Sequence, residues 1–519
     1  EITSMGRLEA GWEELDRAKL NVKAYYIRAR ATMSGEARNA ANFEALGGDY
    51  RAKDLYLAEL DRVTPAQIRE AAAKYLSLEN MTLAVQVPQG KELTREAVLA
   101  ALSQGAREPA AREYKLSNGA TLLVKADHSL PLVAVRAAFL GGLRYEDQRL
   151  SGVSNFLAEV WDKGTKNYSA QELARKVEDI AASINSFSGR NSMGLEAEFL
   201  SGSLDRGLDL LAEVLIRPAL SPEEVEKART NILAAIKRQQ DQVTARTFIL
   251  LAKTVYDGHP YSRNQLGTPE TVSKINAEDI RAFYDQWVKP ANMVLTIVGD
   301  VDPENIRDRL NQLFQGWTGQ AAKEPAIPPP ASWQGLKKAV EEVDKAQAHL
   351  VLAFPAPGLA SPDRFALEVL DAVLSGMGGR MFIELRDKQS LAYNTQSLYQ
   401  PGLGVGLFGL YIAFDPPKLE QVQKGFQKII NDLLEKGITP QELEGAKEYI
   451  LGTFDVGLQS YGAQASNLTF DVLYGLGLDY RRKYVAGINA VTAADVRRVA
   501  QKYLDVKQAA EVIVGAVKE

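Results

Sequence analysis

Few residues in this 519-residue chain have the type and spacing that chemistry requires, and the best candidates are Arg386 and Tyr393. A guanidinium can hold a carbonyl or carboxylate oxygen through several N–H groups, and a tyrosine hydroxyl can donate to an oxyanion as it develops. On residue type alone, a simpler interpretation is that the arginine forms a surface ion pair and that the tyrosine packs at the start of a strand.

A glycine-rich stretch, Ser375–Gly379, precedes these two residues. Glycines before a helix could cradle a phosphate. However, no Gly-Lys-Ser/Thr follows, and the spacing of a dinucleotide-binding loop is absent. We therefore interpret the stretch as a tight strand-to-helix turn, followed by a helix over 380–386.

Metal chemistry is tightly limited by composition. The chain has no cysteine and three histidines, which are His128, His259 and His349. Thiolate catalysis, disulfides and cysteine-ligated metal sites are therefore excluded. No histidine has a partner at ligand spacing, and His259 is interpreted as a structural loop residue. The carboxylate of Glu159 is expected to be solvated or salt-bridged, since one carboxylate cannot hold zinc unaided. No metal site or cofactor is predicted in this chain.

The overall composition is that of a globular protein. Hydrophobic residues make up 46% and charged residues 24%, and the net charge is −5. Such a charge provides no basic surface for nucleic acid or for anionic lipid. No run approaches the roughly 20 apolar residues of a transmembrane segment.

The elements that must position these residues occur three times. Each copy has an N-cap residue, a helix and then an apolar, β-prone run that is expected to be a central strand. The N-caps are Thr64, Asn276 and Thr492, and the apolar runs are 81–87, 293–298 and 510–514. The copies are spaced by 212 and 216 residues, so the repeating domain has about that length.

These spacings define the expected domains. Residues 1–105 form the C-terminal part of an upstream domain, and 112–320 and 335–519 are complete domains. The proline-rich segment 321–334 is the linker between the complete domains, and 105–111 is the hinge after the first part. Because a partial sheet would expose an edge, the chain is expected to be a processed fragment or one partner of a split assembly.

Two motifs in the complete domains resemble the pitrilysin/insulinase (inverzincin) zinc peptidases. The strand 132–140, Gly141-Gly142, the helix 152–161 and Lys163-Gly164-Thr165 are similar to a family signature that reads G-x-x-H-F-L-E-H followed by K-G-T. The segment 375–393 is similar to G-G-x-x-S-R-L-F…L-R-E-x-x-x-L-A-Y. The resemblance covers essentially the whole chain. It implies an α/β fold of the α+β sandwich type, with a mixed sheet flanked by helices in each domain.

The resemblance assigns the functional positions residue by residue. In the family, two histidines and a distant glutamate bind zinc, and a further glutamate activates the bound water. The aligned positions in this chain are Asn155, Ala158, Glu159 and Ala235. All four functions are lost, so we predict no catalytic zinc here. Arg386 and Tyr393 match the pair that closes over the substrate from the opposite half, and the matched spacing favours that role.

The resemblance therefore implies half of a clam-shell metallopeptidase that degrades unfolded peptides. The partner would be an upstream half or a separate subunit bearing H-x-x-E-H and zinc, and this chain alone would be inactive. Residues 181–200 match an edge-strand region to which an extended peptide can add as a strand, although in the family the cleaved peptide pairs mainly with the zinc-bearing half. The alternative is a non-catalytic scaffold subunit of the same fold. A bacterial periplasmic location is expected rather than a cytoplasmic one.

Overall fold

The computed structural model describes residues 12, 15–16, 18–19, 22, 33–76, 110–330, 335–376 and 378–517, apart from the side chains of 33–36, 53–54 and 393. The chain divides into two compact units, Glu1–Arg107 and Glu108–Glu519. The strand expected at 81–87 lies outside the described residues. So do most of the hinge and residues 331–334 of the linker.

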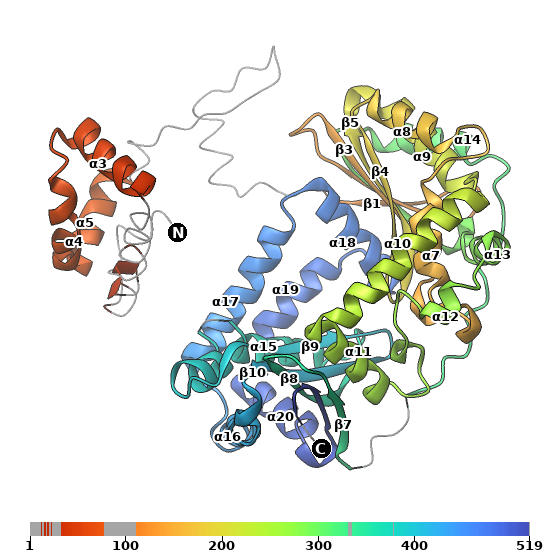
Figure 1. Cartoon of the computed structure of the whole chain (residues 1–519). Helices are drawn as coiled ribbons and strands as arrows, with labels where there is room; N and C mark the ends of the chain where they lie inside the picture. Colours follow the sequence, from red (N-terminus) through yellow and green to blue (C-terminus); the bar gives the residue numbers. More distant parts are fainter. Residues whose placement is uncertain are drawn as a thin grey trace. The chain divides into compact units, whose positions relative to one another are not determined.

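The first unit contains three helices, which are α3 (Met33–Gly47), α4 (Ala52–Arg62) and α5 (Pro65–Tyr75) (Figure 1). The expected N-cap of α5 is confirmed. Thr64 Oγ1 accepts from the backbone N–H of Gln67, and the Gln67 side chain accepts from the backbone N–H of Thr64. Several apolar side chains of this unit face solvent, including Leu46 (89% exposed) and Tyr75 (63%).

The second unit begins with a six-stranded mixed sheet in the order β1-β2-β6-β3-β5-β4. Its strands are β1 (Arg112–Lys115), β2 (Thr121–Ala126), β3 (Leu132–Leu140), β4 (Ser183–Ser188), β5 (Ser192–Leu200) and β6 (Met293–Gly299). Strands β2 and β6 are parallel, and the other pairs are antiparallel. Every residue of β6 is buried, which confirms its predicted central place.

Helices supply the rest of this core. They are α7 (Val153–Trp161), α8 (Ala170–Glu178), α9 (Leu204–Ile216), α10 (Pro222–Asp241), α12 (Pro269–Val272), α13 (Ala277–Trp287) and α14 (Pro303–Leu313). The fully buried ring of Trp161 lies 5.6 Å from that of Tyr284 and 6.1 Å from that of Phe139, measured between centroids. The core therefore joins α7, α13 and β3.

The second sheet has the order β7-β11-β8-β10-β9, which is the order of the first sheet without β1. Its strands are β7 (Lys337–Glu342), β8 (Ala348–Pro357), β9 (Ala392–Pro401), β10 (Val405–Phe414) and β11 (Ala510–Gly515). Its helices include α15 (Arg364–Leu374), α16 (Leu419–Lys436), α17 (Pro440–Gly457), α19 (Tyr480–Ala490) and α20 (Ala493–Tyr503). Since β7 and β11 are parallel and the other pairs antiparallel, the predicted mixed α/β architecture is confirmed.

Each sheet is covered in part by a helix that lies, in the sequence, between two strands of the other sheet. Helix α11 (Val243–Val255) packs on β11 and β8, whereas α18 (Tyr461–Leu473) packs on β3 and β6 (Figure 1). The Tyr461 hydroxyl donates to the Asp127 carbonyl at 3.1 Å, and Thr469 Oγ1 donates to Thr296 Oγ1 at 2.7 Å. The two sheets are therefore parts of one packed unit. Among the described helices, none has both the length and the apolar character to cross a bilayer.

Candidate functional site

Helix α7 is positioned by a buried carboxylate from the preceding loop. Its N-cap residue, Gly152, has a left-handed backbone (φ +97°) and no side chain that could cap the helix. Instead, the Glu146 carboxylate accepts from the backbone N–H groups of Gly152 (2.9 Å) and Ser154 (3.0 Å). Burial raises the pKa of Glu146 to about 7, although these donors and nearby Arg263 oppose the shift. Glu146 could not be identified from the sequence, because it lies outside the local spacing of any cap motif.

The four positions aligned with the zinc signature lie on two helices in contact. Asn155, Ala158 and Glu159 are on α7, and Ala235 is on α10. Glu159 is exposed, and the Ala158 carbonyl accepts from Ser186 Oγ. The Asn155 Nδ2 atom is buried and has no acceptor among the described residues.

This set of side chains does not fit zinc. It offers one amide, two methyl groups and one exposed carboxylate, whereas a catalytic zinc needs three protein ligands. The buried N–H donor of Asn155 would also repel a metal cation. Throughout the described part of the chain, no three His, Asp or Glu side chains are grouped as metal ligands. We therefore derive no catalytic step through zinc in this chain.

The three histidines make contacts with other residues. His128 Nδ1 lies 2.7 Å from Asp300 Oδ1, and His349 Nδ1 lies 3.0 Å from the Tyr411 hydroxyl. His259 Nδ1 accepts from the backbone N–H of Tyr261 at 3.1 Å.

Arg386 lies on a short helix with π geometry, η6 (Phe382–Asp387). The sequence predicted a helix over 380–386 after a strand-to-helix turn. In fact the glycine-rich stretch follows helix α15, so it joins two helices. Wide π turns are rare and occur frequently at functional sites.

Two ion-pair clusters hold η6 in place. The Arg380 guanidinium binds the Glu442 carboxylate through two nitrogens, at 2.5 and 2.7 Å, and donates to the Gly437 carbonyl at 2.8 Å. Glu384 accepts from Lys428 (2.7 Å) and Lys388 (3.1 Å). These contacts fix the helix on both sides of the turn that carries Arg386.

The Arg386 side chain itself is exposed and available. Its guanidinium lies over the ring of Phe382, 4.4 Å from the centroid. It makes no hydrogen bond or ion pair with any described residue. Stacking on an aromatic ring leaves the N–H groups at the edge of a guanidinium free to donate. Among the described residues, Arg386 therefore has an aromatic neighbour but no polar partner.

Tyr393 lies near the start of β9, at an irregularity of the strand. Ala392 pairs with Phe414 and Asn394 pairs with Ala413, so Tyr393 is an extra residue on this strand. Such bulges commonly re-aim a side chain beside a site. The side chain of Tyr393 lies outside the described residues. The Leu391 N–H donates to the Leu385 carbonyl at 2.8 Å, which ties the start of β9 to η6.

A buried network also ties β9 to the glycine-rich turn. Ser397 Oγ donates to the Asp371 carboxylate at 2.5 Å, and the Ser397 N–H donates to Ser375 Oγ at 3.0 Å. The Asp371 carboxylate also accepts from the backbone N–H of Tyr399, while burial raises its pKa. One edge of β9 pairs with β10. The bonds to Asp371 and Ser375 therefore occupy the opposite edge of β9, at residues 397–399.

The edge of the first sheet is more open. The predicted edge-strand region 181–200 contains β4 and β5, and β4 is an outermost strand. Gly189 donates to the Ser192 carbonyl across the hairpin. By alternation, the backbone groups of Ile184, Ser186 and Ser188 therefore point away from β5. The Ser188 carbonyl accepts from Gln265 Nε2 at 2.6 Å, but the backbone of Ile184 and Ser186 has no such partner among the described residues.

Comparisons with known proteins agree with this architecture. The family described as "Insulinase (Peptidase family M16)" matches residues 121–269, and "Peptidase M16 inactive domain" matches 274–450. An uncharacterized zinc protease of Streptomyces coelicolor is 29% identical over 404 residues, which covers 75% of this chain and 87% of that protein. The mitochondrial-processing peptidase subunit beta of Bos taurus is 25% identical over 430 residues, covering 79% and 85%.

Solved structures show the same fold. A peptidase M16 inactive domain from Pseudomonas fluorescens superposes with a TM-score of 0.73 at 22% identity, covering 78% of this chain and 97% of that one. A protease from Helicobacter pylori has a TM-score of 0.72 at 22% identity, covering 78% and 99%.

Proposed function

Because this chain belongs to the insulinase family, peptidase family M16, we propose that its second unit is the non-zinc half of a two-half metallopeptidase. The zinc and the general base would come from a partner half bearing H-x-x-E-H. This chain would bind the peptide and present Arg386 and Tyr393 to the scissile carbonyl.

The observation that carries this proposal is the free guanidinium of Arg386. Two ion-pair clusters hold the helix beneath it, yet the guanidinium pairs with no described residue. A cation fixed in this way can donate to a peptide carbonyl as negative charge develops on the oxygen. Since the positions on α7 and α10 offer no zinc ligands, the residues suited to catalysis in this chain act only together with a partner.

The open edge of β4 supports an unfolded peptide as the substrate. An extended peptide can pair with the free backbone groups of Ile184 and Ser186 and so add a strand to the sheet. Serine and asparagine side chains dominate this strand. Such small side chains would impose little sequence preference, and a folded protein could not present its backbone in this way.

The first unit fits the same proposal as the tail of the zinc-bearing half. Its helix α5 corresponds by the 212-residue repeat to α13. The repeat pairs Tyr75 with Trp287, yet Tyr75 is 63% exposed whereas Trp287 is 2% exposed in its core. We propose that α5 uses this face to cover the sheet of the zinc-bearing half.

The test is hydrolysis of a quenched fluorogenic peptide. The rate is measured for this chain alone, for a zinc-bearing half from the same organism alone, and for the two mixed, each with and without a chelator. We expect chelator-sensitive activity only in the mixture. Arg386→Ala and Tyr393→Phe should each lower kcat/KM by about 100-fold or more, the typical cost of one oxyanion donor.

The outcomes separate the alternatives. Activity of this chain alone would refute the assignment of Asn155, Ala158, Glu159 and Ala235 as lost zinc positions. A stable complex without activity would instead support the scaffold subunit. As a matched control, Arg482→Ala removes an exposed arginine in α19 and should leave the rate of the mixture unchanged.

A further inference from the structure

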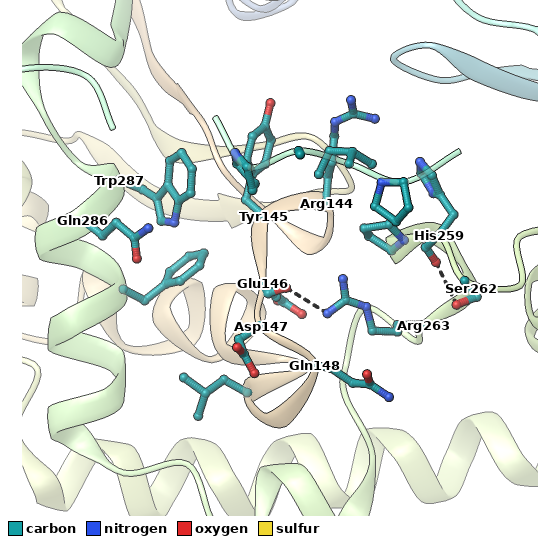
Figure 2. A pocket seen from close by; sticks show the side chains of 18 of the residues that line it. Arg144, Tyr145, Glu146, Asp147, Gln148, His259, Ser262, Arg263, Gln286 and Trp287 are labelled. Atoms are coloured by element: carbon teal, nitrogen blue, oxygen red, sulfur yellow. Dashed lines mark hydrogen bonds between the residues drawn. The ribbon is translucent and has the colours of Figure 1, made fainter. Parts of the chain in front are cut away.

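A pocket of about 760 Å³ is lined by the loop before α7, by α13, by the loop that carries His259 and by residues 323–328. Figure 2 shows Tyr145 and Trp287 on one side of it and His259 and Arg263 on the other. The rings of Tyr145 and Trp287 lie 4.8 Å apart and form an aromatic wall, which Phe283 extends. This volume is in the range of small-molecule sites.

The opposite wall carries an N–H donor from His259. The side chain is 3% exposed, and its Nδ1 atom accepts from the backbone N–H of Tyr261. Burial and the nearby arginines Arg144, Arg263 and Arg190 lower the pKa of His259 to about 4, so the ring is neutral at pH 7. In a neutral imidazole whose Nδ1 accepts, Nε2 carries the proton. No described residue accepts from that Nε2–H.

Two arginines add further donors. Arg263 uses Nη1 to donate to the Glu146 carbonyl at 2.9 Å, and its other nitrogens have no partner among the described residues. Arg144 donates from Nη1 to the Leu403 carbonyl at 2.7 Å, while its buried Nε–H has no acceptor in the described part of the chain. In the aromatic wall, the buried Nε1–H of Trp287 is also without an acceptor there.

The acids that line the pocket are mostly occupied. Glu146 accepts from the first backbone N–H groups of α7, Asp147 accepts from Arg149, and Asp279 accepts from the N-cap backbone of α13. Asp257 is exposed. The pocket therefore has unused donors and few unused acceptors. A ligand that completes these bonds must bring acceptor atoms.

We propose that this pocket binds a ligand with a carboxylate group and an apolar, aromatic body. The carboxylate would accept from His259 and Arg263, and the aromatic body would pack on Tyr145, Phe283 and Trp287. A guanidinium pairs well with a carboxylate because two parallel N–H groups match its two oxygens. The same chemistry could come from a free aromatic acid or from the C-terminal residue of a peptide. This inference does not depend on the peptidase role.

Calorimetric titration of the whole chain tests the inference with two pairs of probes. N-acetyl-phenylalanine represents a peptide C-terminus and phenylacetate a free acid, and their primary amides are the neutral controls. We expect saturable binding of at least one acid, with its amide bound at least about tenfold more weakly, a loss of about 1.4 kcal/mol. Binding of both acids equally would indicate a free acid as the ligand, whereas binding of the acetylated amino acid alone would indicate a peptide terminus.

Three variants locate the site. Arg263→Gln should weaken binding at least about tenfold, while Arg149→Gln, in an exposed arginine close by, should not. Ala282→Trp fills the pocket from an exposed position on α13 and should abolish binding without affecting the core. Equal binding of acids and amides, retained binding in Ala282→Trp, or no saturable binding of either acid would overturn the inference.

Discussion

The buried carboxylate of Glu146 makes the stability of the second unit depend on pH in an unusual direction. Burial raises the pKa of Glu146 to about 7 from 4.5, so the folded state holds its proton more tightly than the unfolded state. Between these two values the folded state binds more protons, and the free energy of unfolding must fall as pH rises. Most carboxylates that are paired in a folded protein act in the opposite direction.

The structure sets the size of this effect. A shift from 4.5 to about 7, at about 1.4 kcal/mol for each pH unit, amounts to about 3 kcal/mol. The loss begins near pH 4.5 and is complete above about pH 8. Asp471 adds a contribution of the same sign, because burial raises its pKa to about 7.

Urea unfolding between about pH 5 and pH 8 measures this slope. Two histidines act in the opposite direction below about pH 6.5, because burial lowers the pKa of His259 and of His349 and the unfolded state then binds the extra proton. The contribution of each acid is therefore the difference between variant and wild type. Glu146→Gln, which is uncharged at every pH, and Asp471→Asn should each make the free energy of unfolding fall less as pH rises. Glu159→Gln is the matched control, since it changes an exposed carboxylate on α7. An unchanged pH dependence in Glu146→Gln relative to wild type would refute the reasoning.

Three further predictions concern the second sheet domain. Arg386→Ala should change the free energy of unfolding by less than about 0.5 kcal/mol, because its guanidinium pairs with no described residue. Arg380→Ala should cost about 2 kcal/mol, since it breaks a half-buried two-nitrogen bond to Glu442, and urea unfolding beside Arg482→Ala measures the difference. Asp363 accepts from Arg498, Lys502 and Tyr503, and these donors hold its pKa well below the usual range. Asp363→Asn should therefore lower the free energy of unfolding by several kcal/mol at pH 7 and by much less in acid. Urea unfolding at both pH values measures this difference.

The repeating elements were predictable because their signals are local. Asn276 and Thr492 cap their helices with the expected partners three residues later, and β6 and β11 follow at the expected places. A cap, a helix and an apolar run lie within some 25 residues of sequence. Because neighbouring residues determine each of these elements, the packing of the whole domain has little influence on where they form.

The features that were missed depend on distant residues. The π geometry around Arg386 accompanies a bond between Arg380 and Glu442, which are 62 positions apart. Helices α11 and α18 each pack on the sheet of the other domain through an apolar face. The periodicity of the sequence predicts such a face, but it does not predict which sheet the face contacts. The donors around His259 were missed for the same reason, because the loops that meet there are separated by more than 100 residues.

The structure of helix α7 is compatible with the prediction that zinc ligands were replaced while the fold was kept. Its residues Phe156, Leu157, Val160 and Trp161 are fully buried and hold the helix to the core. The three signature positions lie on the other side of the same helix, where the side chains are exposed or half-buried. Substitution on that side removes ligands but leaves no large cavity, so it costs little stability. The residues that stabilise the fold and the three positions aligned with the signature therefore occupy separate sides of α7, so substitution at the aligned positions can leave the fold intact.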